Sequence, residues 1–139
     1  MTRTPFDWVP VVFARLRGRN DCVREYRALV SPATDYSIIP MVDAYRLGYP
    51  EAARGNRVTQ PANLFRGVTF GGFWEGTLIC MKEVAIGSSA TPNVDFIAYD
   101  LPQIAGFDVI LGRSFLAPAK VVIDYGERTV RMGHSGGIG

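Results

Sequence analysis

Residues 28–40 of the chain, Ala-Leu-Val-Ser-Pro-Ala-Thr-Asp-Tyr-Ser-Ile-Ile-Pro, decide how the rest of the sequence is interpreted. An apolar run ends at Val30, a polar stretch follows from Ser31, and a second apolar segment runs from Ile38 to Pro40. The run before Val30 predicts a strand, because β-branched and aromatic residues favour extended structure. Serine, proline and aspartate favour turns, so we expect a loop that begins at Ser31.

The rest of the chain is divided in the same way into short apolar runs. Its 139 residues suit one domain, and the 47% of apolar residues suffice for a sizeable core. Fifteen glycines and nine prolines are spread between the runs, which favours an all-β domain. We expect strands at 8–16, 22–30, 64–68, 77–86, 94–99, 109–111, 121–125 and 129–132. Short helical turns are expected at 42–47 and 112–116, and a turn-rich loop at 87–92.

A second segment, from Phe107 to Leu116, reads Phe-Asp-Val-Ile-Leu-Gly-Arg-Ser-Phe-Leu. Together, the two segments resemble the retropepsin-like (retroviral-type) aspartic protease family. There, an apolar strand runs into Asp-Thr/Ser-Gly-Ala, and an apolar-apolar-Gly-Arg-x-x-Leu segment follows the last core strand. The resemblance implies an all-β, pepsin-like (acid protease) closed β-barrel of a single lobe with one or two short helices. It covers about Val9 to Met132 of a single domain, 1–139, which has a frayed tail at about 134–139, and it implies that Arg113 pairs with Asp35.

The resemblance fails at the catalytic position, where Ser31, Pro32 and Ala33 replace Asp-Thr-Gly. Aspartic proteases need two carboxylates that share one proton across a water molecule. A serine hydroxyl is not ionised near neutral pH and needs a base of its own before it attacks a carbonyl. We therefore assign no catalytic residue, and interpret the chain as a degenerate member that lacks the catalytic aspartate.

Other acid and base candidates are weaker. The single histidine, His134, stands in a glycine-rich tail, where a Ser-His arrangement has poor support. Asp108, just before a predicted core strand, is the best carboxylate outside the loop. The remaining aspartates outside the loop are expected at the solvated surface or at caps: Asp43, Asp95, Asp100 and Asp124.

The resemblance also implies a flap, which is a hairpin that closes over a peptide in the groove. Two adjacent glycines between aromatic residues suit a hairpin tip. The residues assigned to this flap and groove are Phe70, Gly71, Gly72, Phe73 and Trp74. A single lobe holds half of a pepsin-like site, so the resemblance implies a homodimer.

Composition limits the partners. Five arginines crowd the first predicted hairpin (Arg15, Arg17, Arg19, Arg24 and Arg27), but the net charge is only +2 and a solvated sheet face is the simpler interpretation. Nucleic acid is not expected as a partner. The spacing of Cys22 and Cys80 predicts no metal site; a disulfide between them is conceivable, and two free buried thiols are the favoured expectation. No cofactor, membrane span or signal peptide is predicted, so we expect a cytoplasmic protein.

Three functions remain open at this point. The favoured one is a catalytically inactive homodimer that binds an extended peptide or a protein partner in the former active-site groove. The second is a peptidase that is active through unorthodox residues. The third is a structural or regulatory assembly protein.

Overall fold

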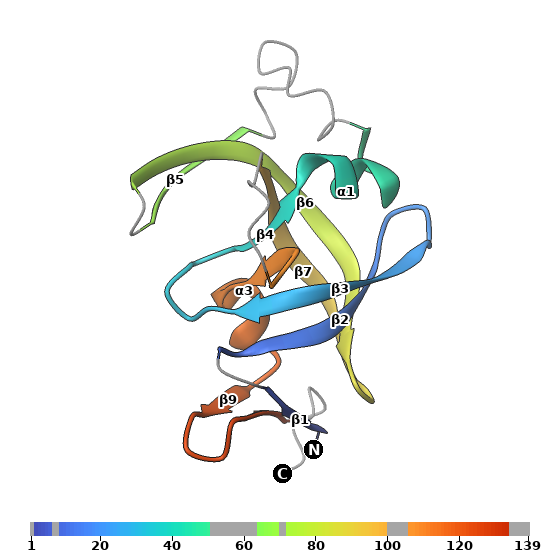
Figure 1. Cartoon of the computed structure of the whole chain (residues 1–139). Helices are drawn as coiled ribbons and strands as arrows, with labels where there is room; N and C mark the ends of the chain where they lie inside the picture. The colour runs from blue at the N-terminus through green and yellow to red at the C-terminus, as the bar shows by residue number, and fades with distance from the viewer. Residues whose placement is uncertain (1, 7–8, 51–63, 70–71, 100–105, 134–139) are drawn as a thin grey trace.

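The computed structural model describes residues 2–6, 9–50, 64–69, 72–99 and 106–133 (Figure 1). Within these ranges the chain forms a seven-stranded sheet, a three-stranded sheet and two short helices. The protein is therefore all-β with two short helices, as the sequence predicted. The expected tail at 134–139 lies outside the described residues.

The larger sheet closes on itself. Its order is β2-β3-β8-β4-β7-β6-β5, and an additional pairing of β2 with β6 joins the ends of the first six strands into a closed barrel. This confirms the predicted single-lobe barrel. The strands are β2 (Val11–Arg17), β3 (Val23–Val30), β4 (Ser37–Pro40), β5 (Leu64–Thr69), β6 (Gly72–Ile86), β7 (Ser89–Tyr99) and β8 (Val109–Leu111).

Strands β2 and β3 form the predicted N-terminal hairpin, with Val11 opposite Leu29 and Arg17 opposite Val23. Side chains alternate along β2, and the inward positions are Val12, Ala14 and Leu16. This period of two is the pattern of a strand with one buried face. The hairpin therefore fixes the position on the barrel of the end of β3 and of the loop that begins at Ser31.

The turn between β6 and β7 differs from the prediction. Instead of a loop over 87–92, the two strands are joined by Gly87 and Ser88 alone, and β7 begins at Ser89. Gly87 has a φ of 59°, and the first central position of a type II′ hairpin turn favours glycine. The dipeptide Gly-Ser is a signal for this turn. The predicted loop extended instead to Pro92, which the structure places within β7.

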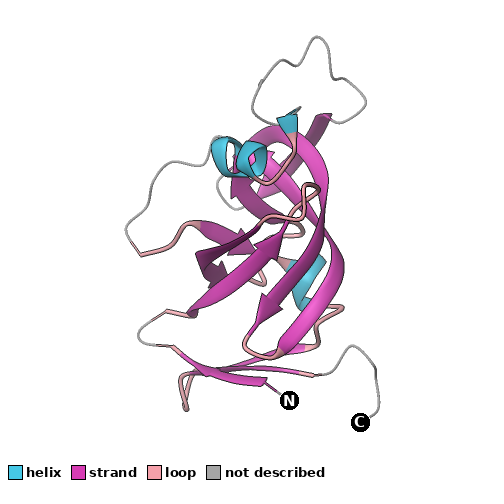
Figure 2. Ribbon diagram, turned by 90° about the vertical axis from the view of Figure 1, so that its right-hand side faces the viewer, coloured by secondary structure: helices cyan, strands magenta, loops and turns pink. Residues whose placement is uncertain are grey.

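The smaller sheet lies at the bottom of Figures 1 and 2, at the end of the barrel away from the β5–β6 hairpin. Its order is β1-β10-β9, and both pairings are antiparallel. The bounds are β1 (Thr2–Pro5), β9 (Val121–Asp124) and β10 (Thr129–Met132). The β9–β10 hairpin was predicted, whereas β1 was not.

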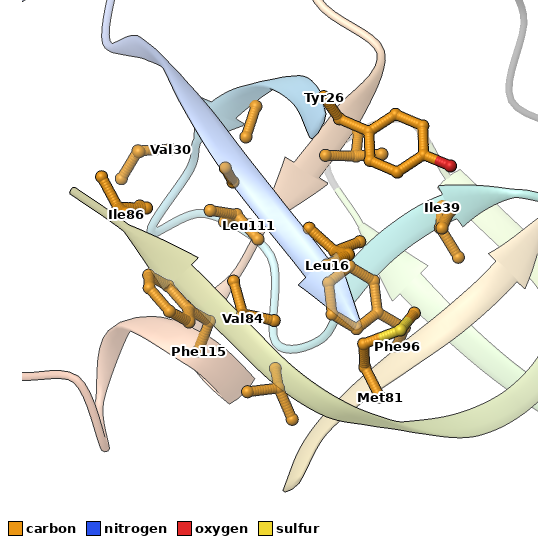
Figure 3. Packing of buried hydrophobic residues seen from close by; sticks show 14 of the residues in the cluster. Leu16, Tyr26, Val30, Ile39, Met81, Val84, Ile86, Phe96, Leu111 and Phe115 are labelled. Atoms are coloured by element: carbon orange, nitrogen blue, oxygen red, sulfur yellow. The ribbon is translucent and has the colours of Figure 1, made fainter. Parts of the chain in front are cut away.

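The core fills the barrel. Figure 3 shows Leu16 of β2, Met81 and Val84 of β6, Phe96 of β7 and Leu111 of β8 within one cluster. Each of these five side chains is fully buried. Burial of an aliphatic or aromatic side chain contributes about 1.5–3 kcal/mol, so this cluster is a main source of stability.

The two helices cover parts of the barrel. Helix α1 (Met41–Arg46) follows β4 directly and ends before Gly48, whose φ of 96° suits glycine after a helix end. Helix α3 (Arg113–Leu116) follows β8 and buries Phe115 in the core. Among the described residues, no helix has the length and apolar character needed to cross a membrane.

Both cysteines are free, as predicted, but both are exposed, so the expectation of buried thiols was wrong. Cys22 belongs to the connection before β3, and Cys80 occupies an outward position of β6 between buried Ile79 and Met81. Strand alternation explains the second case, because neighbours of inward residues face solvent.

Candidate functional site

The loop that begins at Ser31 is a compact turn between β3 and β4. The backbone N–H of Ser31 donates to the carbonyl oxygen of Leu111 at 2.9 Å, so the loop starts against β8. The carbonyl oxygen of Ser31 accepts from the backbone N–H of Thr34 at 3.4 Å and from its Oγ1 at 3.3 Å. Thr34 is buried, whereas Pro32 and Ala33 are exposed at the tip.

The start of α3 holds the second half of this loop. The backbone N–H groups of Arg113 and Ser114 donate to the carbonyl oxygens of Thr34 and Asp35, each at 2.9 Å. The N–H of Gly112 donates to Oγ of Ser37 at 3.0 Å. Segments about 80 residues apart in sequence are thus joined by backbone hydrogen bonds, each of which contributes about 1 kcal/mol net.

A pair of serines extends this contact. Ser114 Oγ donates to the carbonyl oxygen of Asp95 at 2.7 Å and accepts from the backbone N–H of Ser37 at 2.9 Å. The two hydroxyl oxygens, of Ser37 and Ser114, lie 3.0 Å apart. Three elements, β4, β7 and α3, therefore meet around two buried or half-buried hydroxyls. Sequence reasoning missed this network, because serine is common and the partners are distant in sequence.

Gly112 makes the close approach possible. A Cβ atom at this position would lie 2.5 Å from Oγ1 of Thr34 and 2.8 Å from its carbonyl oxygen, and closer still to the carbonyl oxygen of Tyr36. Real Cβ atoms do not approach that closely. Glycine is therefore required here for space, as is usual where two backbone segments touch.

Arg113 and Asp35 form an ion pair in this structure. Their side chains are 60% and 65% exposed, and solvent weakens such a pair to between about 0 and 1 kcal/mol. The pair lies at a shallow polar depression on the surface, which is lined by Asp35, Tyr36, Asn93, Asp95, Arg113 and Ser114. The carboxylate of Asp35 is thereby engaged with a guanidinium rather than placed with a second acid.

The opposite side of Ser31 is apolar. The N–H of Val30 donates to the carbonyl oxygen of Pro10 at 2.8 Å, which continues the β2–β3 register beyond Val11 and Leu29. Val9, which is 51% exposed, lies at this end of the hairpin, where the N–H of Val11 donates to the carbonyl oxygen of Val9 at 2.7 Å and the chain turns at Pro10. Leu29, two residues before Ser31 in the chain, is half-buried. Exposed and half-buried apolar residues therefore lie at the end of the hairpin that leads into the Ser31 loop.

Asp108, the best outside candidate by sequence, is held by Arg27. Its Oδ2 accepts from the backbone N–H of Arg27 at 3.0 Å, and its Oδ1 accepts from the guanidinium at 3.0 Å. The hydrogen bond from the Arg27 side chain lowers the pKa of Asp108. A carboxyl group with a lowered pKa is a poor proton donor near neutral pH, so this residue has the features of a structural anchor.

Asp43 differs from the expectation of a solvated surface residue. It lies in α1 with its side chain only 16% exposed, and its Oδ1 accepts from the hydroxyl of Tyr26 at 3.4 Å. Burial raises the pKa of Asp43, and burial also raises the pKa of Tyr26 to about 12. The position of α1 brings the two side chains together, which the sequence spacing did not indicate.

The residues assigned to the flap are described only in part. Phe70 and Gly71 lie outside the described residues, and Gly72, Phe73 and Trp74 form the start of β6. Strand β5 pairs with this part of β6, with Thr69 opposite Gly72. A hairpin thus exists where the flap was expected, and its role as a flap stays a prediction. His134 and Asp100 also lie outside the described residues.

The hairpin arginines are distributed over several environments. Arg27 is paired with Asp108, Arg19 lies 4.6 Å from the centre of the Tyr49 ring, and Arg15 faces Glu25 across the strands. Asp21, in the turn, binds Lys82 at 2.9 Å. These contacts favour the solvated, charge-balanced face over a continuous basic patch. Among the described residues, no group of three or more potential metal ligands is found.

Two solved structures share this architecture. A retropepsin-like aspartic protease from Rickettsia conorii superposes with a TM-score of 0.60 at 16% identity, over 96% of this chain and 90% of that one. The chain has the retropepsin-like fold. The retroviral protease-like domain of Ddi1 from Leishmania major gives a TM-score of 0.51 at 14% identity, over 96% of this chain and all of that one.

Comparison by sequence adds nothing further to this assignment. No protein-family model matches the chain, and no curated protein matches it. At the identities found, the structural likeness shows the fold and leaves the activity to be argued from the residues of this chain.

Proposed function

We propose that two copies of this chain bind an extended polypeptide beside Ser31 and do not cleave it. One observation carries the proposal. The loop that begins at Ser31 keeps its backbone contacts to Leu111 and α3, whereas its first residue carries a hydroxyl in place of a carboxylate. These contacts support the proposal that the chain keeps the body of a protease-like site without the acid on which the chemistry depends.

The side chains in and around the loop support the lack of cleavage. Peptide hydrolysis by this fold requires a base that activates water and an acid that protonates the substrate carbonyl. Ser31 supplies neither near neutral pH, and Pro32 has no backbone N–H to donate. The carboxylates of Asp35 and Asp108 are each bound to an arginine. Hydrolysis therefore lacks its proton-transfer groups at this position.

The proposal of an extended ligand rests on shape and polarity. The solved structure of highest similarity described above is named a protease, and a protease of this fold takes a polypeptide. Val9 and Leu29 offer apolar surface at the end of the hairpin that leads into the Ser31 loop, and the β5–β6 hairpin projects from the barrel (Figure 1). An extended peptide gains main-chain hydrogen bonds and fills alternate side-chain positions in such a place.

Binding is tested with a library of fluorescent peptides and fluorescence anisotropy. The variant Val9→Lys introduces a charge at the end of the hairpin from which the Ser31 loop departs, and Val23→Lys is the matched control, because Val23 is 49% exposed at the far end of the same hairpin. We expect Val9→Lys to weaken binding by about tenfold, the cost of placing a charge in an apolar contact worth about 1.4 kcal/mol. Equal affinities of both variants and the unmodified protein would refute binding at this surface.

Cleavage is tested on the same peptides from acid to neutral pH. The proposal expects no turnover by the unmodified protein. Turnover that disappears in Ser31→Ala, or in Asp35→Asn or Asp108→Asn, would establish the alternative of a peptidase with unorthodox residues. Mass spectrometry of the peptides distinguishes the two results directly.

A further inference from the structure

The shallow polar depression beside α3 is a second surface with the features of a binding site. It has a volume of about 520 Å³, and its walls come from the loop after β3, from β7 and from α3. The apolar residues of the proposed function, Val9 and Leu29, are not among the residues that line it. What this depression binds is therefore a separate question from what binds at the end of the β2–β3 hairpin.

The polar groups of the depression differ in whether they already have partners. The guanidinium of Arg113 is bound to Asp35, and Oγ of Ser114 donates to the carbonyl oxygen of Asp95. The carboxylate of Asp95, by contrast, has no hydrogen bond or ion pair within the described part of the chain. Two carboxylates against one guanidinium leave an excess of one negative charge, so the depression attracts a cation.

Asn93 has an unusual backbone conformation at the wall of the depression. Its φ of 55° lies in the left-handed region although it stands in the middle of β7. Strand β7 remains paired with β6 at both neighbours, Pro92 and Val94, so the departure is confined to one residue. Residues other than glycine adopt this conformation infrequently, and such outliers concentrate at ligand sites. The side-chain amide of Asn93 also has no hydrogen-bond partner among the residues that the structure describes.

We propose that this depression binds the guanidinium group of an arginine side chain that projects from another polypeptide. A carboxylate accepts two parallel hydrogen bonds from a guanidinium, and Asp95 offers such a carboxylate. The amide oxygen of Asn93, two residues away on the same strand, accepts from another of the five N–H donors. Tyr36 also lines the depression, and guanidinium groups stack on aromatic rings.

Other ligands fit this chemistry less well. An anion meets the excess of negative charge, and the guanidinium of Arg113 is already bound to Asp35. A metal ion lacks ligands, because no group of three or more potential metal-binding side chains occurs over the described ranges. A small molecule is usually enclosed on most of its surface, which a shallow depression does not achieve. A side chain that is held by its own polypeptide needs no such enclosure.

A titration followed by nuclear magnetic resonance locates the ligand. The isotope-labelled protein is mixed with a capped glycyl-arginyl-glycine peptide, or with the matched peptide in which citrulline replaces arginine and removes the charge. We expect the arginine peptide to shift the backbone amide signals of Asn93, Asp95 and Ser114, and the citrulline peptide to leave them in place. Signals that move equally with both peptides, or that move only elsewhere, would overturn the site.

Asp95→Asn tests the carboxylate, because it removes the charge and keeps the size of the side chain. We expect the Kd of the arginine peptide to rise by about tenfold, as a lost charge-assisted contact implies. The matched control is Glu25→Gln, which removes an exposed carboxylate from β3 and should leave the Kd unchanged. An equal change in both variants would reveal an effect of net charge alone and overturn the role of Asp95.

Asn93→Gly separates the amide from the backbone conformation. Glycine adopts a positive φ without steric cost, so this variant should resist urea at least as well as the unmodified protein. Its Kd for the arginine peptide should nevertheless rise by about fivefold, as the loss of one hydrogen bond implies. Unchanged binding would overturn the role of the amide.

Two further ligands define what is recognised. A lysine peptide should bind more weakly, because an ammonium group lacks the planar fork; equal affinity would overturn recognition of the guanidinium. Free arginine should also bind more weakly, because its own carboxylate meets the excess of negative charge, and equal affinity would overturn a polypeptide as the source. Binding at the Val9 end of the hairpin is judged separately by anisotropy, so failure of one proposal leaves the other intact.

Discussion

Replacement of Gly112 by alanine is expected to loosen the loop that begins at Ser31. The new Cβ atom would lie 2.5 Å from Oγ1 of Thr34 and 2.8 Å from its carbonyl oxygen, where ordinary contacts begin at about 3.4 Å. Either α3 or the loop must move by several tenths of an ångström or more. Cores are packed too densely to absorb such a shift without loss of contacts.

The expected change in the free energy of unfolding follows from the hydrogen bonds that the new Cβ atom would weaken. Two backbone hydrogen bonds, from Arg113 N–H to Thr34 and from Ser114 N–H to Asp35, are both 2.9 Å long and span the gap that the Cβ would widen. Overpacking typically costs about 1–3 kcal/mol, and each weakened hydrogen bond adds up to about 1 kcal/mol. The free energy of unfolding should therefore fall by about 2–4 kcal/mol. A domain with a stability of about 5–15 kcal/mol remains mostly folded after such a loss.

Urea unfolding followed by tryptophan fluorescence measures this change. Gly126→Ala is the matched control, because the nearest atom to its Cβ would be Oδ1 of Asp124 at an ordinary 3.4 Å. The control should stay within about 0.5 kcal/mol of the unmodified protein, as surface substitutions usually do. If Gly112→Ala unfolds at the same urea concentration as Gly126→Ala, the contact between α3 and the loop is not close in solution, and the account of the site is wrong.

Three further predictions concern the same structure. Arg113→Gln removes an ion pair that is more than half exposed, and should lower the free energy of unfolding by less than about 1 kcal/mol in urea; a loss as large as that of Gly112→Ala would contradict this ranking. Leu111→Ala empties a fully buried site and should cost about 2–5 kcal/mol by thermal unfolding, against less than about 1 kcal/mol for Leu78→Ala at a position 37% exposed. Asp108 has a pKa lowered by Arg27, so its stabilising effect is present above its unfolded pKa and is lost as pH falls through the folded pKa. Asp108→Asn should therefore destabilise the protein at neutral pH and reduce the loss of stability on acidification, and unchanged acid unfolding would refute that assignment.

Much of the fold was predictable from local pattern. Strand β2 was found because residues 8–16 are rich in valine and aromatic side chains, and the β9–β10 hairpin because a turn interrupts two apolar runs. Strand β1 was missed because Thr-Arg-Thr-Pro has neither alternation nor an apolar face. It is extended because β10 offers it a partner about 125 residues later in sequence, and pattern reasoning does not detect such distant pairing.

Only those contacts of the candidate site whose residues belong to a recognisable motif were predictable from the sequence. The pairing of Arg113 with Asp35 came from the resemblance, and both residues are charged and easily recognised. The hydroxyl pair of Ser37 and Ser114 has no such signature, because its geometry arises from the crossing of β4 and α3. The need for glycine at position 112 likewise follows from the close approach of its backbone to that of Thr34 and Tyr36. The spacing of residues along the sequence does not reveal this contact.

The hydrogen bonds of the loop explain how the retropepsin-like fold accommodates a serine at position 31. The described bonds of Ser31 use its backbone groups, since its N–H donates to Leu111 and its carbonyl oxygen accepts from Thr34. None of these bonds depends on the side chain at position 31, so an aspartate there is replaceable at little cost to the loop. The acid of an aspartic protease is costly rather than stabilising, because two like charges must share one site. The hydrogen bonds of the loop are thus independent of the side chain at position 31. Under the proposed function, a serine at this position removes the reaction while the surface around it stays in place.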